Sequence, residues 1–317
     1  MDRESEFFKN RRVLVTGGCG FVGQNLVNNL LNKGCQVTVT STGSEPKIEN
    51  VHKILYSTLE GIDWKYVRNQ DILIHLMANN DTLFSDEQEM MRANFYGPIK
   101  LFESAQEGGC KNFIYASSTA VYGDSPAPYT ENTKINPLNV YGKSKAEFDD
   151  FAMEFAKKRS VNVKGFRFCN IYGPGEERKG KRMSMIGQML RQIIGHKNSI
   201  TLFKDGNQKR DWVHVYDVVD ALISSTLNIC SINGGEIYNL GSGTSHTFNE
   251  VARVIQEEYA ARGFLEEIKV EYIDCPFLKN YQTFTECNIE KARRELNYSP
   301  SFDLRSGIKQ YLQYLLG

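Results

Sequence analysis

The strongest constraint on the fold is an alternation of short apolar runs with helical patterns over the first 170 residues. Runs rich in β-branched and other apolar residues predict buried strands at 12–17, 35–41, 71–77, 112–118 and 161–168. Apolar residues at helical spacing predict helices at 21–31, 87–107 and 139–158. Strands that alternate with helices in this way predict a parallel sheet that helices cover on both faces.

Beyond residue 173 the alternation becomes irregular. One more buried strand is expected at 236–242, with helices and short strands outside the main sheet at 175–210 and 243–317. A chain of 317 residues has room for two domains or one large one.

The composition excludes several classes of protein. The 38 basic and 38 acidic residues leave no net charge, which argues against nucleic acid as a partner. The longest apolar stretches, such as DILIHLMA, are far shorter than the roughly 20 residues that span a bilayer, so no membrane partner is expected. The N-terminus, MDRESEFFKNRR, lacks the apolar run of a signal peptide.

The positions of the cysteines and histidines indicate the cellular compartment and bear on metal binding. The seven cysteines are scattered without a CxxC pair, and the five histidines form no i,i+4 pair and no cluster with cysteine. Such cysteines are typical of reduced thiols in the cytoplasm rather than of a disulfide framework. We therefore expect a cytoplasmic protein without a protein-bound metal.

The stretch VTGGCGFVG joins the first predicted strand to the first predicted helix. Gly17, Gly20 and Gly23 allow a tight turn, and the N–H groups at the start of the helix would face a pyrophosphate. In this strand–turn–helix context the motif predicts a dinucleotide site, to which Phe21 and Val22 also belong. An ordinary strand-to-helix turn is the alternative.

The end of the second strand, VTVTSTGSEPK, indicates which dinucleotide binds. An NAD site usually has a carboxylate there, which accepts hydrogen bonds from the ribose hydroxyls. Here Ser41 and Thr42 stand at that position, with Lys47 nearby. Hydroxyls and a lysine can hold a 2′-phosphate that a carboxylate would repel. We therefore expect NADP as the cofactor, with NAD as the alternative because Glu45 lies in the same loop.

Two Tyr-x-x-x-Lys pairs are present, and their contexts differ. Tyr141 and Lys145 share a helix face and follow Ser118, which ends a predicted strand where ligands bind in such sheets. Tyr96 and Lys100 have no comparable serine before them, so structural or surface roles are expected for them.

The first pair has a clear chemical logic. A nearby ammonium and a cationic nicotinamide would lower the pKa of a tyrosine from its usual value of about 10. Tyr141 would then exchange a proton with a hydroxyl while hydride leaves the same carbon. Ser118 would hold the developing carbonyl oxygen, and Lys145 would also anchor the nicotinamide ribose.

Six motifs follow one another over nearly the whole chain: TGGCGFVG, NFIYASSTAVYGD, YGKSK, FRFCNIYGPG, KRDWVHVYDVVDA and YNLGSG. Their order resembles the extended short-chain dehydrogenase/reductase family of NAD-dependent epimerases and dehydratases. The resemblance implies an α/β fold with a Rossmann-type doubly wound parallel sheet over 1–174, to which 211–242 return. It implies a smaller substrate-binding domain over 175–210 and 243–317.

The same resemblance implies roles for particular residues and partners. The expected substrate is a nucleotide sugar, and the expected assembly is a homo-oligomer. The resemblance places Leu76, Ala78 and Asn94 at the cofactor, and Asn170, Arg210 and Tyr281 at the substrate.

Subgroups of this family differ in the residues at particular positions of these motifs. The 4,6-dehydratases carry an Asp-Glu pair after the catalytic serine or threonine, whereas Thr119 and Ala120 follow Ser118 here. The stretches NPLNVYGKSK, RKGKRMSM and FLKNYQTFTECNIEKARREL resemble the ADP-L-glycero-D-manno-heptose 6-epimerases, which use NADP. In that subgroup a lysine in the loop after YGP is a second acid/base. Lys179 falls on it, with Arg178 in place of the usual histidine before it.

The leading hypothesis is therefore an epimerase that oxidises one sugar carbon transiently and returns hydride to its opposite face. A UDP-hexose 4-epimerase, in which Tyr141 suffices and Lys179 contacts only phosphate or water, is the first alternative. A net reductase that consumes NADPH and a non-catalytic dinucleotide sensor are the others. Arg178, Lys181 and Arg182, the other cations of GPGEERKGKRM, are either solvated charges or phosphate ligands.

The cofactor expectation has a direct test. The purified protein should prefer NADP because Ser41 replaces the expected carboxylate. A tenfold preference corresponds to about 1.4 kcal/mol, less than one charge-assisted hydrogen bond can contribute. Ser41→Asp should shift the preference towards NAD. Titration with both cofactors measures the two affinities, and tighter binding of NAD by the unaltered chain would contradict the expectation.

Overall fold

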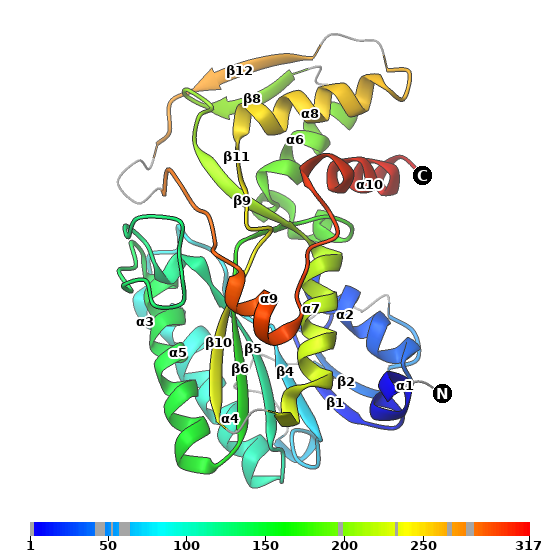
Figure 1. The fold of residues 1–317 in the computed structure, drawn as a ribbon, viewed down its shortest axis with the longest axis vertical. Coiled ribbons are helices and arrows are strands. Elements are labelled where there is room, and N and C mark those ends of the chain that lie inside the picture. Colours follow the sequence, from blue (N-terminus) through cyan, green and yellow to red (C-terminus); the bar gives the residue numbers. More distant parts are fainter. Residues whose placement is uncertain are drawn as a thin grey trace. The chain divides into compact units, whose positions relative to one another are not determined.

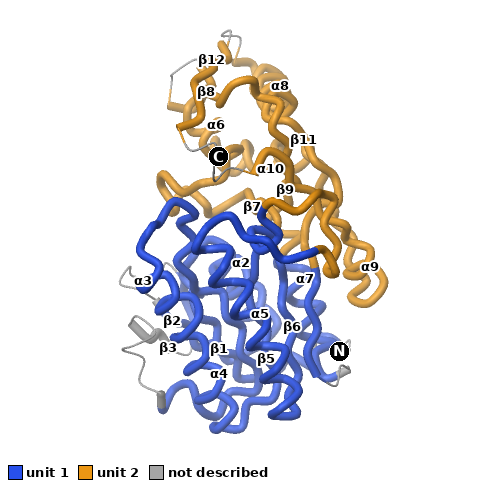
Figure 2. The backbone as a smooth tube through the Cα atoms, turned by 90° about the vertical axis from the view of Figure 1, so that its left-hand side faces the viewer, with its two compact units in different colours: residues 1–123, 134–167, 219–238 blue, residues 124–133, 168–218, 239–317 orange. Residues whose placement is uncertain are grey.

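The computed structural model describes residues 3–41, 48–51, 53–56, 64–195, 199–231, 234–264, 268–276 and 282–317. The chain forms two compact units, each built from several segments (Figure 2). Unit 1 comprises 1–123, 134–167 and 219–238, and unit 2 comprises 124–133, 168–218 and 239–317.

The centre of unit 1 is a seven-stranded sheet with the order β10-β6-β5-β4-β1-β2-β3 (Figure 1; β3 is labelled in Figure 2). β1 pairs in parallel with β2 and β4, and the pairs β2–β3 and β4–β5 are also parallel. The strand order reverses beside β1, and ligands of such sheets bind beyond the carboxyl ends of the strands at this point. The strands are β1 (Arg12–Thr16), β2 (Gln36–Ser41), β3 (Lys53–Tyr56), β4 (Ile72–His75), β5 (Asn112–Ser118), β6 (Asn162–Phe168) and β10 (Gly235–Leu240).

Helices cover both faces of this sheet, as the sequence predicted. On one face Phe102 packs against Phe113 and Phe148, with ring centroids 4.8 and 5.2 Å away. On the opposite face Lys164 of β6 donates hydrogen bonds to the carbonyl oxygens of Ser225 and Asn228, in and just after α7. The helices are α1 (Arg3–Phe8), α2 (Phe21–Asn32), α3 (Glu87–Met91), α4 (Gly97–Glu107), α5 (Val140–Arg159) and α7 (Val215–Leu227).

The strands and helices expected in the first 170 residues are present, and α1 at the N-terminus is an element that the sequence patterns did not predict. β3 was not expected from the sequence. The helix expected over 87–107 consists of α3, a π-helical turn at Arg92–Tyr96 (η2) and α4. A π turn inserts one residue into the helical spacing locally, so a helical pattern in the sequence does not reveal it.

Unit 2 contains a three-stranded sheet with the order β11-β9-β7 and a two-stranded sheet formed by β12 and β8. Its core packs Trp212 and Tyr172 against apolar residues of α6, α8 and α10. The strands are β7 (Asn170–Tyr172), β8 (Ser199–Phe203), β9 (Lys209–His214), β11 (Ser245–Thr247) and β12 (Lys269–Ile273). The helices are the 3-10 helix η4 (Glu176–Arg182), α6 (Met185–Ile194), α8 (Phe248–Ala260), α9 (Glu290–Leu296) and α10 (Leu304–Leu316).

Short helical turns complete the described chain. They are the 3-10 segments η1 (Trp64–Tyr66), η3 (Thr119–Val121) and η5 (Ile229–Ser231). Within the described ranges, every helix is too short or too polar to cross a membrane.

Candidate active site

The glycine-rich turn connects the carboxyl end of β1 to α2. Gly17 has a φ of +70°, in the left-handed region that favours glycine. A Cβ at Gly23 would lie 2.1 Å from the carbonyl oxygen of Gly17, so only glycine permits this contact. Gly20 caps α2 without a side-chain hydrogen bond, which suits a helix start that binds an anion. Phe21 is buried and Val22 half-buried in the first turn of α2.

The other residues expected at the cofactor lie at the same edge of the sheet. Leu76 and Ala78 follow β4 directly and are half-buried. The backbone N–H of Leu76 donates to the carbonyl oxygen of Thr16 at 3.0 Å, which holds this segment beside the glycine turn. Ser41 is the last residue of β2, and Thr42 lies outside the described residues.

Asn94, in the π-helical turn η2, connects the segment after β4 to α5. Its Oδ1 accepts a hydrogen bond from Asn79 N at 2.8 Å. Its Nδ2 donates to Asn79 O at 2.8 Å and to Ser144 Oγ at 3.2 Å. The buried amide therefore joins the edge expected at the cofactor to the helix that carries Tyr141 and Lys145. π turns often occur at functional sites.

β5 and α5 bring Ser118, Tyr141 and Lys145 together. Ser118 ends β5, and the other two residues lie one turn apart on α5. The hydroxyls of Ser118 and Tyr141 are hydrogen bonded. The Nζ atom of Lys145 donates to the carbonyl oxygen of Ala116 in β5 at 3.0 Å.

Exposure separates this pair from the second Tyr-x-x-x-Lys pair. Tyr96 is 56% exposed and Lys100 is also exposed. Lys145 is only 3% exposed, and Tyr141 is half-buried. The surface position expected for Tyr96 and Lys100 is thus observed.

A close backbone approach sets the position of Tyr141. Asn139 caps α5, and its Oδ1 accepts a hydrogen bond from Gly142 N at 2.8 Å. A Cβ at Gly142 would lie 2.5 Å from the carbonyl oxygen of Ala120, just beyond β5. A side chain at position 142 would therefore push the first turn of α5 away from β5, and Tyr141 away from Ser118.

Burial has the largest effect on the pKa values of Tyr141 and Lys145. It raises the pKa of Tyr141, and the hydrogen bond from Ser118 opposes the rise. Burial also lowers the pKa of Lys145 to about 8, and the Asp149 carboxylate opposes that fall. The lowering of the Tyr141 pKa that the sequence suggested therefore needs the positive charge of a bound nicotinamide.

Asp149 belongs to this site, and the sequence reasoning missed it. Its Oδ2 accepts from Arg167 Nε at 2.8 Å, and its Oδ1 accepts from Tyr115 OH at 2.9 Å. Burial raises the pKa of Asp149, and the Arg167 guanidinium opposes the rise. The spacing of Tyr141, Lys145 and Asp149, every four residues on one helix face, is the signal that could have found it.

Asn170 and Arg210, which the resemblance assigned to the substrate, lie on neighbouring strands of unit 2. Asn170 begins β7, Arg210 lies in β9, and the two strands pair in parallel. Asn170 Nδ2 donates to Asp211 O at 3.2 Å and to Thr285 Oγ1 at 3.4 Å. Tyr281, the third residue assigned to the substrate, lies outside the described residues.

The basic stretch after β7 forms η4, and its four cations are not equivalent. Arg178, Lys181 and Arg182 are exposed, whereas Lys179 is half-buried. Residues three apart share one side of a 3-10 helix, which places Lys179 on the same side as Glu176.

Glu176 is buried and well bonded. Ser184 Oγ donates to its Oε1 at 2.6 Å, and Ser184 N donates to its Oε2 at 3.3 Å. Burial raises the pKa of Glu176 to about 7, and the charge of Lys179 opposes the rise. Burial lowers the pKa of Lys179, Glu176 opposes the fall, and Arg182 adds to it. Sequence reasoning missed Glu176 because it looks like one more charge in a charged run.

Comparison with known proteins shows the family to which the chain belongs. The model of the family described as "NAD dependent epimerase/dehydratase family" matches residues 13–241. Two relatives are named ADP-L-glycero-D-manno-heptose-6-epimerase. The protein from Brachyspira hyodysenteriae is 30% identical over 96% of this chain and 97% of its own length. The protein from Alkalilimnicola ehrlichii is 33% identical over 95% of this chain and 96% of its own length.

A solved structure is similar over the full length. The crystal structure of Helicobacter pylori ADP-L-glycero-D-manno-heptose-6-epimerase is 29% identical, covers 100% of both chains and has a TM-score of 0.86. The family match includes the glycine turn, Ser118 and the Tyr141–Lys145 pair. This chain belongs to the NAD dependent epimerase/dehydratase family, whose enzymes work with a nicotinamide cofactor.

Proposed function

We propose that this enzyme epimerises a nucleotide sugar, and that the substrate is an ADP-glycero-manno-heptose inverted at carbon 6. The arrangement of Ser118, Tyr141 and Lys145 at the carboxyl end of β5 carries the proposal. The relatives named as heptose 6-epimerases support the choice of substrate. Assembly as a homo-oligomer in the cytoplasm is part of the same proposal.

We propose NADP as the cofactor, with NAD as the alternative. The turn at Gly17, Gly20 and Gly23 suits a dinucleotide because a Cβ at Gly23 would fill the space against Gly17 O. Ser41 at the end of β2 replaces the carboxylate of an NAD site, while the family description names NAD. A nicotinamide held there would supply hydride chemistry, so that a sugar carbon could be oxidised transiently and then reduced again.

The residues of unit 1 have distinct proposed tasks. Tyr141 takes a proton from the substrate hydroxyl and later returns it. Ser118, which lies beside Tyr141, turns its single hydroxyl proton from Tyr141 to the same substrate oxygen when substrate binds. Lys145 holds the nicotinamide ribose. In unit 2, Arg210 binds the diphosphate through its guanidinium, and Asn170 contacts the sugar nucleotide.

A second proton-transfer group distinguishes a 6-epimerase from a 4-epimerase. We assign that role to Lys179, because it is half-buried with a lowered pKa while the other cations of η4 are exposed. A lysine whose pKa lies closer to neutrality can both accept and donate a proton. In a UDP-hexose 4-epimerase, the alternative, Tyr141 alone would suffice. In a net reductase, NADPH would be consumed in proportion to product.

The role of Tyr141 is tested by Tyr141→Phe, which removes only the hydroxyl. We expect turnover to fall by a factor on the order of a hundred to ten thousand, the usual contribution of such proton transfer. Circular dichroism and cofactor titration should show a folded chain that still binds the cofactor. Tyr96→Phe is the matched control and should behave like the unaltered enzyme. Full activity of Tyr141→Phe would show that another group moves the proton.

Lys179→Met tests the second acid/base. Epimerisation of an ADP-heptose should be strongly suppressed, with little change in KM, because the substitution removes a proton-transfer group and not a ligand of the substrate. Lys181→Met, two residues away and exposed, is the control and should leave kcat nearly unchanged. A raised KM with unaltered kcat would identify Lys179 as a phosphate ligand, and the 4-epimerase would become the better description.

The pH dependence of turnover tests the pairing of Glu176 with Lys179. The negative charge of Glu176 favours the ammonium form of Lys179, so Glu176→Gln should lower the pKa of this lysine further. The limb of the kcat–pH profile that reports Lys179 should then move to lower pH. Glu177→Gln, on a less buried neighbour, is the control. An unmoved limb in Glu176→Gln would contradict the pairing.

A further inference from the structure

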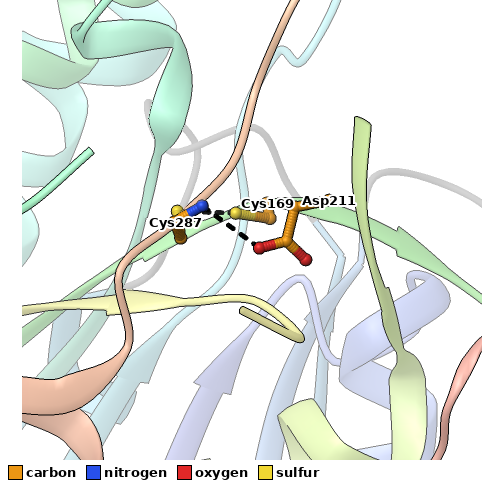
Figure 3. Close-up of side chains that lie close together, drawn as sticks. All are labelled: Cys169, Asp211 and Cys287. Carbon is orange, nitrogen blue, oxygen red and sulfur yellow. Dashed lines mark hydrogen bonds between the residues drawn. The ribbon is translucent and has the colours of Figure 1, made fainter. Parts of the chain in front are cut away.

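Cys169 and Cys287 lie side by side in unit 2, although 118 residues separate them in the chain (Figure 3). Both are buried thiols, and their Sγ atoms are 2.7 Å apart. The Cys169 thiol donates a hydrogen bond to the Cys287 sulfur.

Backbone hydrogen bonds hold both cysteines in place. Cys169 lies between β6 and β7, and its N–H donates to Leu240 O at 2.9 Å. The N–H of Cys287 donates to Asp211 Oδ2 at 3.2 Å. The residues on either side of Cys287 exchange hydrogen bonds of 2.8 Å with the backbone of Tyr129. The proximity of the two thiols is therefore set by secondary structure and not by flexible side chains alone.

The other cysteines have different surroundings. Cys35 and Cys110 are buried singly, and each donates to a backbone carbonyl oxygen at 3.4 Å. Cys230 is exposed. Cys169 and Cys287 thus form a pair of adjacent thiols, which their distant positions in the sequence did not indicate.

Asp211 completes a group of three potential metal ligands, but its carboxylate is already engaged. Its Oδ1 accepts from Ser242 N at 2.7 Å and from Ser242 Oγ at 2.8 Å, and its Oδ2 accepts from Gly243 N at 3.2 Å. Because these donors occupy the carboxylate, Asp211 is poorly placed to complete a metal site with the two thiols.

We propose that Cys169 and Cys287 form a disulfide when the protein meets a peroxide. One Cys169 S–O bond forms as the O–O bond of hydrogen peroxide breaks, and the thiol proton leaves with the released hydroxide as water. The Cys287 sulfur then attacks the Cys169 sulfur. The S–S bond forms, the S–O bond breaks, and the Cys287 proton leaves with hydroxide as a second water. Two thiols are oxidised, and one peroxide is reduced to two waters.

The surroundings of the two thiols should make formation of this disulfide slow. Once formed, the disulfide should stabilise the folded protein. Burial raises the pKa of Cys169 well above its usual value, and the thiolate is the form that reacts. The bond would join the chain after β6 to the segment that carries Thr285, beside Asn170. Closing such a long loop restricts the unfolded chain, so the oxidised protein should melt on the order of 5 °C higher.

The experiment treats the purified full-length protein with hydrogen peroxide. It is then denatured in N-ethylmaleimide and digested without reduction for mass spectrometry. We expect a disulfide-linked peptide containing Cys169 and Cys287, and a raised Tm that dithiothreitol reverses. Cys169→Ser and Cys287→Ser should each abolish the linked peptide and the shift in Tm. Cys110→Ser, a buried thiol outside the pair, is the matched control and should retain both.

Oxidation of the exposed Cys230 in the same digest shows that the peroxide acted. If Cys230 is oxidised while Cys169 and Cys287 remain fully alkylated, the proposal is wrong. It is equally wrong if the reduced protein binds one equivalent of Zn²⁺ and both serine variants lose that binding, because the pair is then a metal site. Neither readout uses catalytic activity, so both are independent of the proposed reaction.

Discussion

The first turn of α5 can lie against the chain after β5 because residue 142 is a glycine. A Cβ there would come within 2.5 Å of Ala120 O, so this contact fixes how closely the helix approaches the end of the strand. Ser118 and Tyr141 are hydrogen bonded across the same junction. The buried amide of Asn94 then joins α5 to the segment after β4, so that one helix connects the proposed catalytic hydroxyls with the edge expected to bind the cofactor.

Each unit holds a lysine whose pKa burial lowers and whose ammonium a nearby carboxyl group supports. In unit 1 the pair is Lys145 with Asp149, one turn later on α5. In unit 2 it is Lys179 with Glu176, one turn earlier on η4. The carboxyl groups have different partners of their own. Asp149 is bound by Arg167, whereas Glu176 is bound by the neutral Ser184 and has a pKa of about 7.

Much of the fold and part of the site could be predicted from local patterns. The strands β1, β2, β4, β5 and β6, the glycine turn and α5 all follow from apolar periodicity and glycine placement, because backbone sterics and burial act over a few residues. The serine at the end of a predicted strand distinguished the Tyr141–Lys145 pair from the Tyr96–Lys100 pair. The structure places Tyr96 on the surface. Asp149 and Glu176 were missed because a charged residue in a sequence does not show whether it is buried.

The sequence by itself determined the alternation of strands and helices, the glycine turn and the family, because each depends on residue types at fixed short spacings. Only the tertiary structure decided which charges lose contact with water, and hence which pKa values move. It also decided that two cysteines 118 residues apart lie at 2.7 Å. Contacts between distant segments arise from packing, and no spacing along the chain encodes the distance between two side chains that the fold brings together.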